Sequence, residues 1–181
     1  LRAPAQAAID FIVAAQHPAG GWRYHPGQDG DTSVLGWQLM ALQSARAARL
    51  DVPTATLEAA QRYLDSALTG DEVSYAYRPG EGPSHVMTAE ALLCRMYLGA
   101  GLRDADVREG LAQMAQQHPP RREETNVYYW YYATQALHHA GGSTWDEWNR
   151  ALRDVLVQLQ ETTGHAAGSW SPRGPHAEAG G

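Results

Sequence analysis

The sequence lacks most of the features that mark common functional classes. Its single cysteine, Cys94, excludes an internal disulfide. No Lys/Arg cluster runs along one face and the formal net charge is −6, so we expect no nucleic-acid partner. No apolar run approaches the roughly 20 residues needed to span a bilayer, and no signal-peptide pattern is present. These absences predict a soluble domain without a transmembrane segment.

The composition is that of one ordered domain. Hydrophobic residues make up 44% of the 181 residues and charged residues 19%, which is typical of globular proteins. The chain begins at Leu1 rather than at a methionine, and residues 178–181 read as a connecting loop. We therefore interpret residues 1–181 as a single domain that is a segment of a longer protein.

Hydrophobic periodicity predicts an all-α fold. No period-2 alternation is strong enough for a sheet, whereas apolar residues recur at helical spacing. The expected helices, separated by loops rich in Gly and Pro, span about residues 3–16, 33–50, 53–67, 87–99, 105–117, 125–140 and 145–160. The second, fourth and sixth are apolar on most faces, so we expect them to be buried all round beneath the more polar helices.

Markers in the helices repeat at one period. Leu42 and Leu137 end matching apolar stretches 95 residues apart, which is two steps of about 48. Gln16 and Gln160 lie 144 residues apart, which is three such steps. The chain is therefore expected to consist of helix-pair repeats.

Two segments share an unusual pattern of an apolar helix end, a glutamine, a short loop and Gly-x-Trp. Gln16 precedes Gly20-Gly21-Trp22, and Gln160 precedes Gly168-Ser169-Trp170. The pattern resembles the QW repeat of the terpenoid cyclase and protein prenyltransferase superfamily, in particular the squalene-hopene cyclase-like and squalene oxidase repeat proteins of bacteria. The resemblance implies an α/α toroid in which each tryptophan packs on its glutamine and staples the outer helices.

Three helix pairs and a seventh helix would make only an arc of such a toroid. The resemblance therefore implies that the remainder of the ring lies beyond Gly181 or comes from an oligomer. It leaves the compartment open between a bacterial cytoplasmic protein and part of a larger exported or membrane-anchored one.

The resemblance also indicates where an acid would lie. Triterpene cyclases of the superfamily protonate their substrate with the middle aspartate of a D-x-D-D-T motif, and the matching stretch here is Gln28-Asp29-Gly30-Asp31-Thr32. Gly30 stands at the proton donor's position and has no proton to give. Asp31 remains a candidate acid, with Asp29 raising its pKa as a like charge. The alternative is that Asp31 caps the helix that follows.

We expect no metal site and no cofactor. Prenyltransferases of the superfamily hold zinc with Asp, Cys and His. Cys94 lies in an apolar helix with no carboxylate two residues before it, which favours a buried, inert thiol. The histidines lack ligand spacing.

The aromatic run from Tyr128 to Tyr132 is the most unusual composition in the chain. Tyr128, Tyr129, Tyr131 and Tyr132, together with Trp37 on an earlier inner helix, are candidate cavity residues. Aromatic faces stabilise carbocations by cation–π attraction, as cyclases of the family do. The alternative is ordinary helix packing.

Two functions from different classes follow. The first is a non-catalytic toroid segment that binds an apolar isoprenoid or a protein partner, or acts as a scaffold. The second is an isoprenoid-processing enzyme with an aromatic-lined cavity; a carbohydrate-active barrel is a more distant third. An apolar pocket at the inner helix N-termini would favour the enzyme, and a filled interior the non-catalytic module.

Overall fold

The computed structural model describes residues 1–70 and 72–171, and this part of the chain is all-α, as predicted. Pairing between extended segments is confined to three isolated bridges there. The elements are α1 (Arg2–Ala14), α2 (Thr32–Ala47), α3 (Thr54–Ala67), α4 (His85–Tyr97), α5 (Ala105–Gln117), a 3-10 turn η1 (Arg122–Glu124), α6 (Val127–Ala140) and α7 (Gly142–Leu159). None of these helices is both long enough and apolar enough to cross a membrane.

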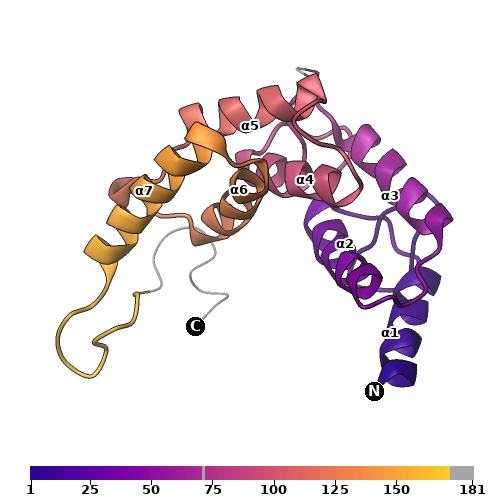
Figure 1. Ribbon diagram of the computed structural model, residues 1–181. Coiled ribbons are helices and arrows are strands. Elements are labelled where there is room, and N and C mark those ends of the chain that lie inside the picture. Colours follow the sequence, from indigo (N-terminus) through magenta and orange to yellow (C-terminus); the bar gives the residue numbers. More distant parts are fainter. Residues whose placement is uncertain (71, 172–181) are drawn as a thin grey trace.

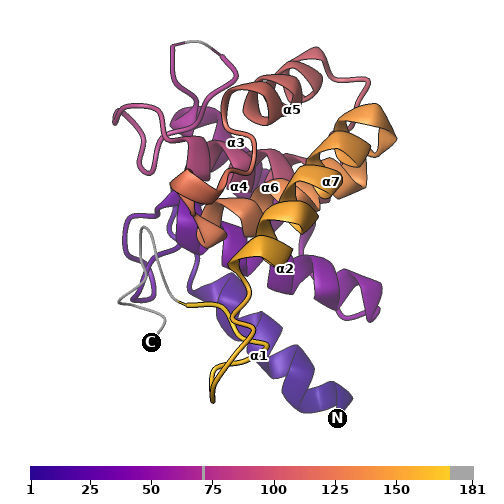
Figure 2. The same ribbon diagram turned by 90° about the vertical axis from the view of Figure 1, so that its left-hand side faces the viewer.

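The helices follow an arc with two layers (Figure 1). Helices α2, α4 and α6 lie along its concave side, while α3, α5 and α7 lie along its convex side. Helix α1 stands at one end of the arc and the loop after α7 at the other, and Figure 2 views the molecule at right angles to this direction. The most apolar helices thus form one layer and the amphipathic helices the other.

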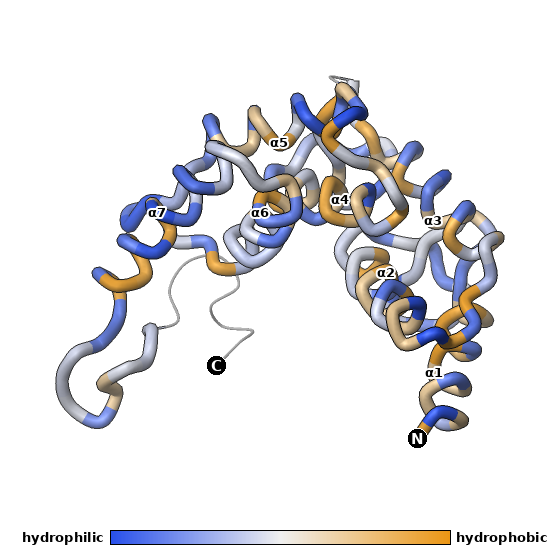
Figure 3. The backbone as a smooth tube through the Cα atoms, in the orientation of Figure 1, coloured by the Kyte–Doolittle hydropathy of each residue, from blue (hydrophilic) through white to orange (hydrophobic). Residues whose placement is uncertain are grey.

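Helix α4 is the centre of the core. It packs against α2, α5 and α6, and every side chain from residue 86 to residue 95 is buried. The Ser84 hydroxyl caps the helix by accepting a hydrogen bond from the Met87 N–H at 3.4 Å. Gly99, with φ +108°, follows its last turn. The tube in Figure 3 shows stretches of hydrophobic residues along α4.

Two expectations about the helices were wrong. Helices α2 and α6 are not buried all round, because Trp37 is 50% exposed and Tyr131 is 45% exposed. The seventh helix begins at Gly142 rather than at Trp145, since Gly141 alone makes the turn after α6 with φ +69°. Gly141 and Gly142 both have positive φ, and the chain re-enters a helix at once.

The two QW segments make the same pair of hydrogen bonds. In the first, the Trp22 indole N–H donates to the Ile12 carbonyl at 2.7 Å and the Gln16 amide donates to the Gly20 carbonyl at 2.9 Å. In the second, the Trp170 indole donates to the Leu156 carbonyl at 2.8 Å and the Gln160 amide to the Gly168 carbonyl at 2.9 Å. Each tryptophan therefore joins its loop to the last turn of the preceding helix.

Candidate functional site

The aromatic run of α6 divides between two faces of the helix. Tyr129 is buried towards the convex layer, where its hydroxyl donates to the Met114 carbonyl at 3.2 Å and its ring meets Trp148 edge-on at 5.9 Å. The other three tyrosines interact with α2 or α4. Tyr129 is therefore a packing residue, unlike the concave-side candidates it was grouped with.

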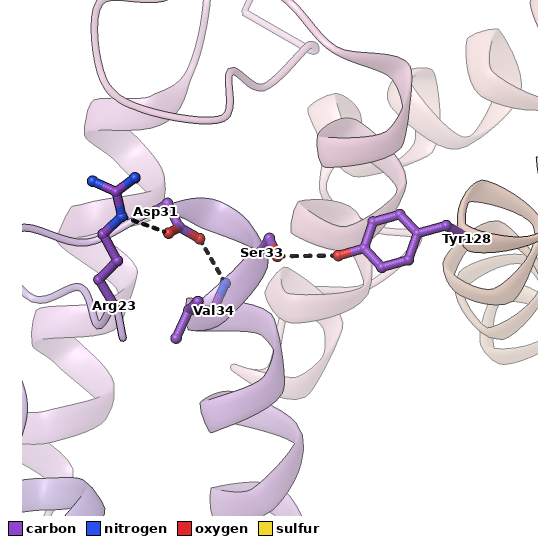
Figure 4. A network of polar contacts seen from close by, with 5 residues as sticks. All are labelled: Arg23, Asp31, Ser33, Val34 and Tyr128. Atoms are coloured by element: carbon purple, nitrogen blue, oxygen red, sulfur yellow. Dashed lines mark hydrogen bonds and ion pairs between the residues drawn. The ribbon is translucent and has the colours of Figure 1, made fainter. Parts of the chain in front are cut away.

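Four aromatic side chains cross from α6 to α2 over α4. Trp37 stacks on Tyr131 with ring centroids 6.2 Å apart and meets Tyr132 edge-on at 6.3 Å. Tyr128 meets Tyr132 edge-on at 5.1 Å. The Tyr128 hydroxyl donates to the Ser33 hydroxyl at 3.1 Å (Figure 4). We call Trp37, Tyr128, Tyr131 and Tyr132 the aromatic bridge.

Glu90 of α4 lies beneath the aromatic bridge and has no exposed surface. One of its carboxyl oxygens lies 3.4 Å from the Tyr128 hydroxyl oxygen. The other lies against α2 at Gly36, where an added Cβ would be only 2.0 Å from it. The absence of a side chain at position 36 therefore makes the space that Glu90 occupies.

Burial controls the acid chemistry of Glu90. The loss of hydration raises the pKa of its carboxyl to about 8, although the hydroxyls of Tyr132 and Tyr128 act in the opposite direction. The Asp31 charge adds to the rise. The pKa of the Tyr132 hydroxyl is raised as well, first by its own burial and then by the charge of Glu90. Glu90 is therefore a neutral, proton-carrying carboxyl at pH 7, which is the state a general acid needs.

Glu90 was missed by the sequence interpretation. The available signal was one carboxylate in a helix that is otherwise apolar on most faces, because such a residue must be buried with the rest of that helix.

Asp31 is the N-cap of α2 and is fully buried. One carboxylate oxygen accepts from the Val34 N–H at 2.8 Å, and the other lies 3.3 Å from the Arg23 guanidinium (Figure 4). The carboxylate also raises the pKa of Tyr77 to about 12, after burial, which is the larger cause. Asp31 thus acts as the hydrogen-bond acceptor that holds the end of this helix.

Asp29 has different surroundings. Its side chain is exposed and lies 3.1 Å from the imidazole of His17. The two candidate aspartates therefore contact different residues, His17 for Asp29 and Arg23 for Asp31.

Metal-ligand chemistry has little support in the described residues. Within residues 1–70 and 72–171, no three His, Cys, Asp or Glu side chains are grouped to hold a metal ion. Cys94 is buried, and burial raises the pKa of its thiol, which makes it a poor ligand and nucleophile. His85 and His118 stack with centroids 4.6 Å apart rather than converging on a point.

Four cavities lie away from the aromatic bridge. Their volumes are about 490, 290, 330 and 710 Å³, and neither the bridge nor Glu90 lines any of them. The first lies between His85, His118 and the start of α6, and the second between the start of α6 and the loop after α7. Glu90 itself is fully buried, so the surrounding side chains cover it.

Searches against models of protein families and against curated proteins find no match for this chain.

Proposed function

We propose that this chain is part of a terpenoid cyclase-like α/α toroid that acts as a non-catalytic binding or scaffold module. The observation that supports it most is the identical pair of hydrogen bonds at the two QW segments, 144 residues apart at Gln16 and Gln160. Matching hydrogen bonds at two turns, three repeat periods apart, are expected of a helical-hairpin array. The arc of two helical layers is consistent with it.

The candidate acids support the non-catalytic interpretation. Asp31 is engaged in capping α2 and pairing with Arg23. Glu90 carries a proton but has no exposed surface, and no described cavity leads a substrate to it. A general acid must come within hydrogen-bond reach of the atom that it protonates.

The concave side still offers a binding surface. Trp37 and Tyr131 are 50% and 45% exposed, and their stacked rings form an apolar platform between α2 and α6. Exposed stacked aromatics suit an apolar or flat ligand, including an isoprenoid. We assign the binding role to this pair.

One observation favours the second function, an isoprenoid-processing enzyme. A neutral carboxyl beneath four aromatic rings combines a proton donor with groups that stabilise a carbocation. If the aromatic bridge opened to a substrate, Glu90 rather than Asp31 would be the acid.

The test is to incubate the purified chain with squalene and farnesol and to analyse organic extracts by mass spectrometry. We expect bound, unchanged isoprenoid, and we expect binding to weaken at least tenfold in Trp37→Ala. Leu102→Ala, a change at another exposed hydrophobic residue, is the control. If the wild type forms a cyclised product and Glu90→Gln does not, the chain is an isoprenoid-processing enzyme rather than a non-catalytic module. If the extracts contain neither bound isoprenoid nor product, a scaffold role is the function that remains.

A further inference from the structure

Two histidines from different helices stack on each other. His85 is the first residue of α4 and His118 is the C-cap of α5, and their ring centroids are 4.6 Å apart with 26° between the planes. Tyr129 of α6 meets His85 edge-on at 5.0 Å and His118 edge-on at 6.2 Å. We call these three residues the histidine cluster, and three helices meet at it.

The stack depends on ring contact and not on polar contacts. Within residues 1–70 and 72–171, neither imidazole makes a hydrogen bond or an ion pair. Both side chains are partly buried. Neutral aromatic rings attract each other at this separation, whereas two positively charged imidazolium rings repel each other.

The surroundings disfavour a positive charge on His85. Burial lowers the pKa of its imidazole from the ordinary value of 6.5, and the charge of His118 lowers it further, while Glu124 acts in the opposite direction. The ring also lies at the N-terminus of α4, where the helix dipole repels a cation. Tyr129 contributes a neutral ring, because burial raises the pKa of its hydroxyl. His85 is therefore mainly neutral at pH 7.

Cavities flank the stack on both sides. One of about 490 Å³ and another of about 330 Å³ are each lined by both His85 and His118. The charged residues that line the first are Arg122, Glu123 and Glu124 of η1. Apart from the two histidines, uncharged residues of α4, α5 and the loop before α4 line the second. Each ring thus has space beside it into which it can move.

The segment that follows His118 has few contacts that would resist such a movement. In the described part of the chain, the hydrogen bonds of residues 119–125 stay within the segment, from the Glu124 N–H to the Arg121 carbonyl and from the Thr125 hydroxyl to the Arg122 carbonyl. Of its side chains, only that of Pro120 is buried. A segment with few contacts opens at little cost in free energy.

We propose that the His85–His118 stack is a pH-sensitive switch, which keeps residues 118–126 against the start of α4 while the rings are neutral and releases them when both rings are charged. Two charged rings 4.6 Å apart repel each other, and each can move into a neighbouring cavity. Release joins the two cavities into one space, because both rings line each of them.

The direction of the switch follows from the surroundings of His85. The pKa of His85 is lower in the stacked state than in an unfolded chain, so the stacked state binds fewer protons and loses stability as pH falls below about 6.5. Acid therefore opens the switch. No residue of the aromatic bridge belongs to the histidine cluster, so a failure of this switch leaves the proposed binding role as it stands.

Proton NMR of the protein at pH 7.5 and pH 5.0 tests the switch. At pH 7.5 we expect nuclear Overhauser cross-peaks that join the His118 ring to the rings of His85 and Tyr129. At pH 5.0 these cross-peaks should be lost. The cross-peak between Tyr129 and Trp148, whose rings meet at 5.9 Å, should remain and is the internal control. The chemical shift of the His85 ring reports its protonation in the same spectra.

Two variants remove one charge each. In His85→Gln, the cross-peak between His118 and Tyr129 should remain at pH 5.0. In His118→Gln, the His85 ring should titrate at a higher pH than in the wild type, because the charge that opposes its protonation is gone. His25→Gln, at an exposed histidine in the loop before α2, is the matched control and should behave as the wild type does.

Persistence of the stack in acid would overturn the proposal. Cross-peaks between His118 and His85 that remain at pH 5.0 have this meaning, whether His85 is charged or still neutral. Loss of the cross-peak between His118 and Tyr129 in His85→Gln would overturn it as well, because the segment would then move without repulsion between the two rings.

Discussion

A carboxyl group without exposed surface loses the hydration that stabilises its charge, and Glu90 illustrates the consequence. Only the hydroxyls of Tyr128 and Tyr132 oppose the effect of burial, and a neutral hydroxyl replaces little of the lost water. The folded protein therefore retains a proton on Glu90 that the unfolded chain releases at a much lower pH. This difference links stability to pH.

We predict that Glu90→Gln changes the pH dependence of unfolding. Since the pKa of Glu90 rises from 4.5 to about 8 on folding, the unfolded state binds fewer protons between these values and stability falls as pH rises through this window. The Glu90 contribution to the slope is about 1.4 kcal/mol per pH unit, and Gln should remove it. Urea denaturation between pH 5 and pH 9 measures the slope.

Glu58→Gln, at an exposed position of α3, is the control and should leave the slope as it is. A Glu90→Gln protein with the wild-type slope would mean that the Glu90 carboxyl is ionised in the folded state at neutral pH.

At the scale of the helices, α2 and α4 can approach closely because residue 36 is a glycine and has no side chain. Glycine at this position lowers the helix propensity of α2, but it leaves room for the Glu90 carboxyl. A side chain there would have to displace a fully buried group in the most buried helix.

Gly36→Ala should therefore destabilise the protein by roughly 1–3 kcal/mol, the usual cost of overpacking, despite the better helix propensity of alanine. Gly110→Ala in α5 is the control, because its Cβ would lie 3.0 Å from a terminal carbon of Leu92, a flexible side-chain end. Thermal unfolding of both variants gives the comparison. Equal midpoints would contradict the tight contact between Gly36 and Glu90.

The two QW tryptophans should differ in their effect on stability although their hydrogen bonds match. Trp22→Ala opens a cavity under α3 and should cost about 3–5 kcal/mol. Trp170 is half-exposed, so Trp170→Ala should cost the isolated chain about 1 kcal/mol, mainly through the lost hydrogen bond. Chemical denaturation measures both, and a Trp22→Ala cost below about 0.5 kcal/mol would contradict the stapling role.

At the scale of the whole molecule, burial decreases from the centre of the arc to its ends. Helix α4 touches three other helices, whereas α1 packs chiefly on α2 and has one buried side chain, Ile9. Local opening requires little energy where few apolar contacts are lost.

Native-state hydrogen exchange should therefore show the slowest amides in α4 and the fastest helical amides in α1 and the last turns of α7. The expected difference exceeds tenfold in exchange rate for monomeric protein at low concentration. Protection of α1 equal to that of α4 at low concentration would contradict this gradient.

Local sequence signals determined the helices and several of their ends, although α7 begins three residues before the predicted start. The 3.6-residue apolar period, the capping aspartate at position 31 and the glycines after the helices act within a few residues, so the all-α fold was predictable. The bonds within each QW turn are also local, since they join residues at most 14 apart. The toroid itself remains a prediction, supported by the arc but not established by it.

Only the tertiary structure decided which of these residues have unusual chemistry or exposure. The protonation of Glu90 depends on α2 and α6, which exclude water from it. Tyr129 and Tyr131 are two positions apart, yet one is buried and the other is half-exposed. Trp22 and Trp170 share a motif, yet one is 2% exposed and the other 48%. Desolvation is a property of everything that surrounds a group, and those neighbours come from distant parts of the chain.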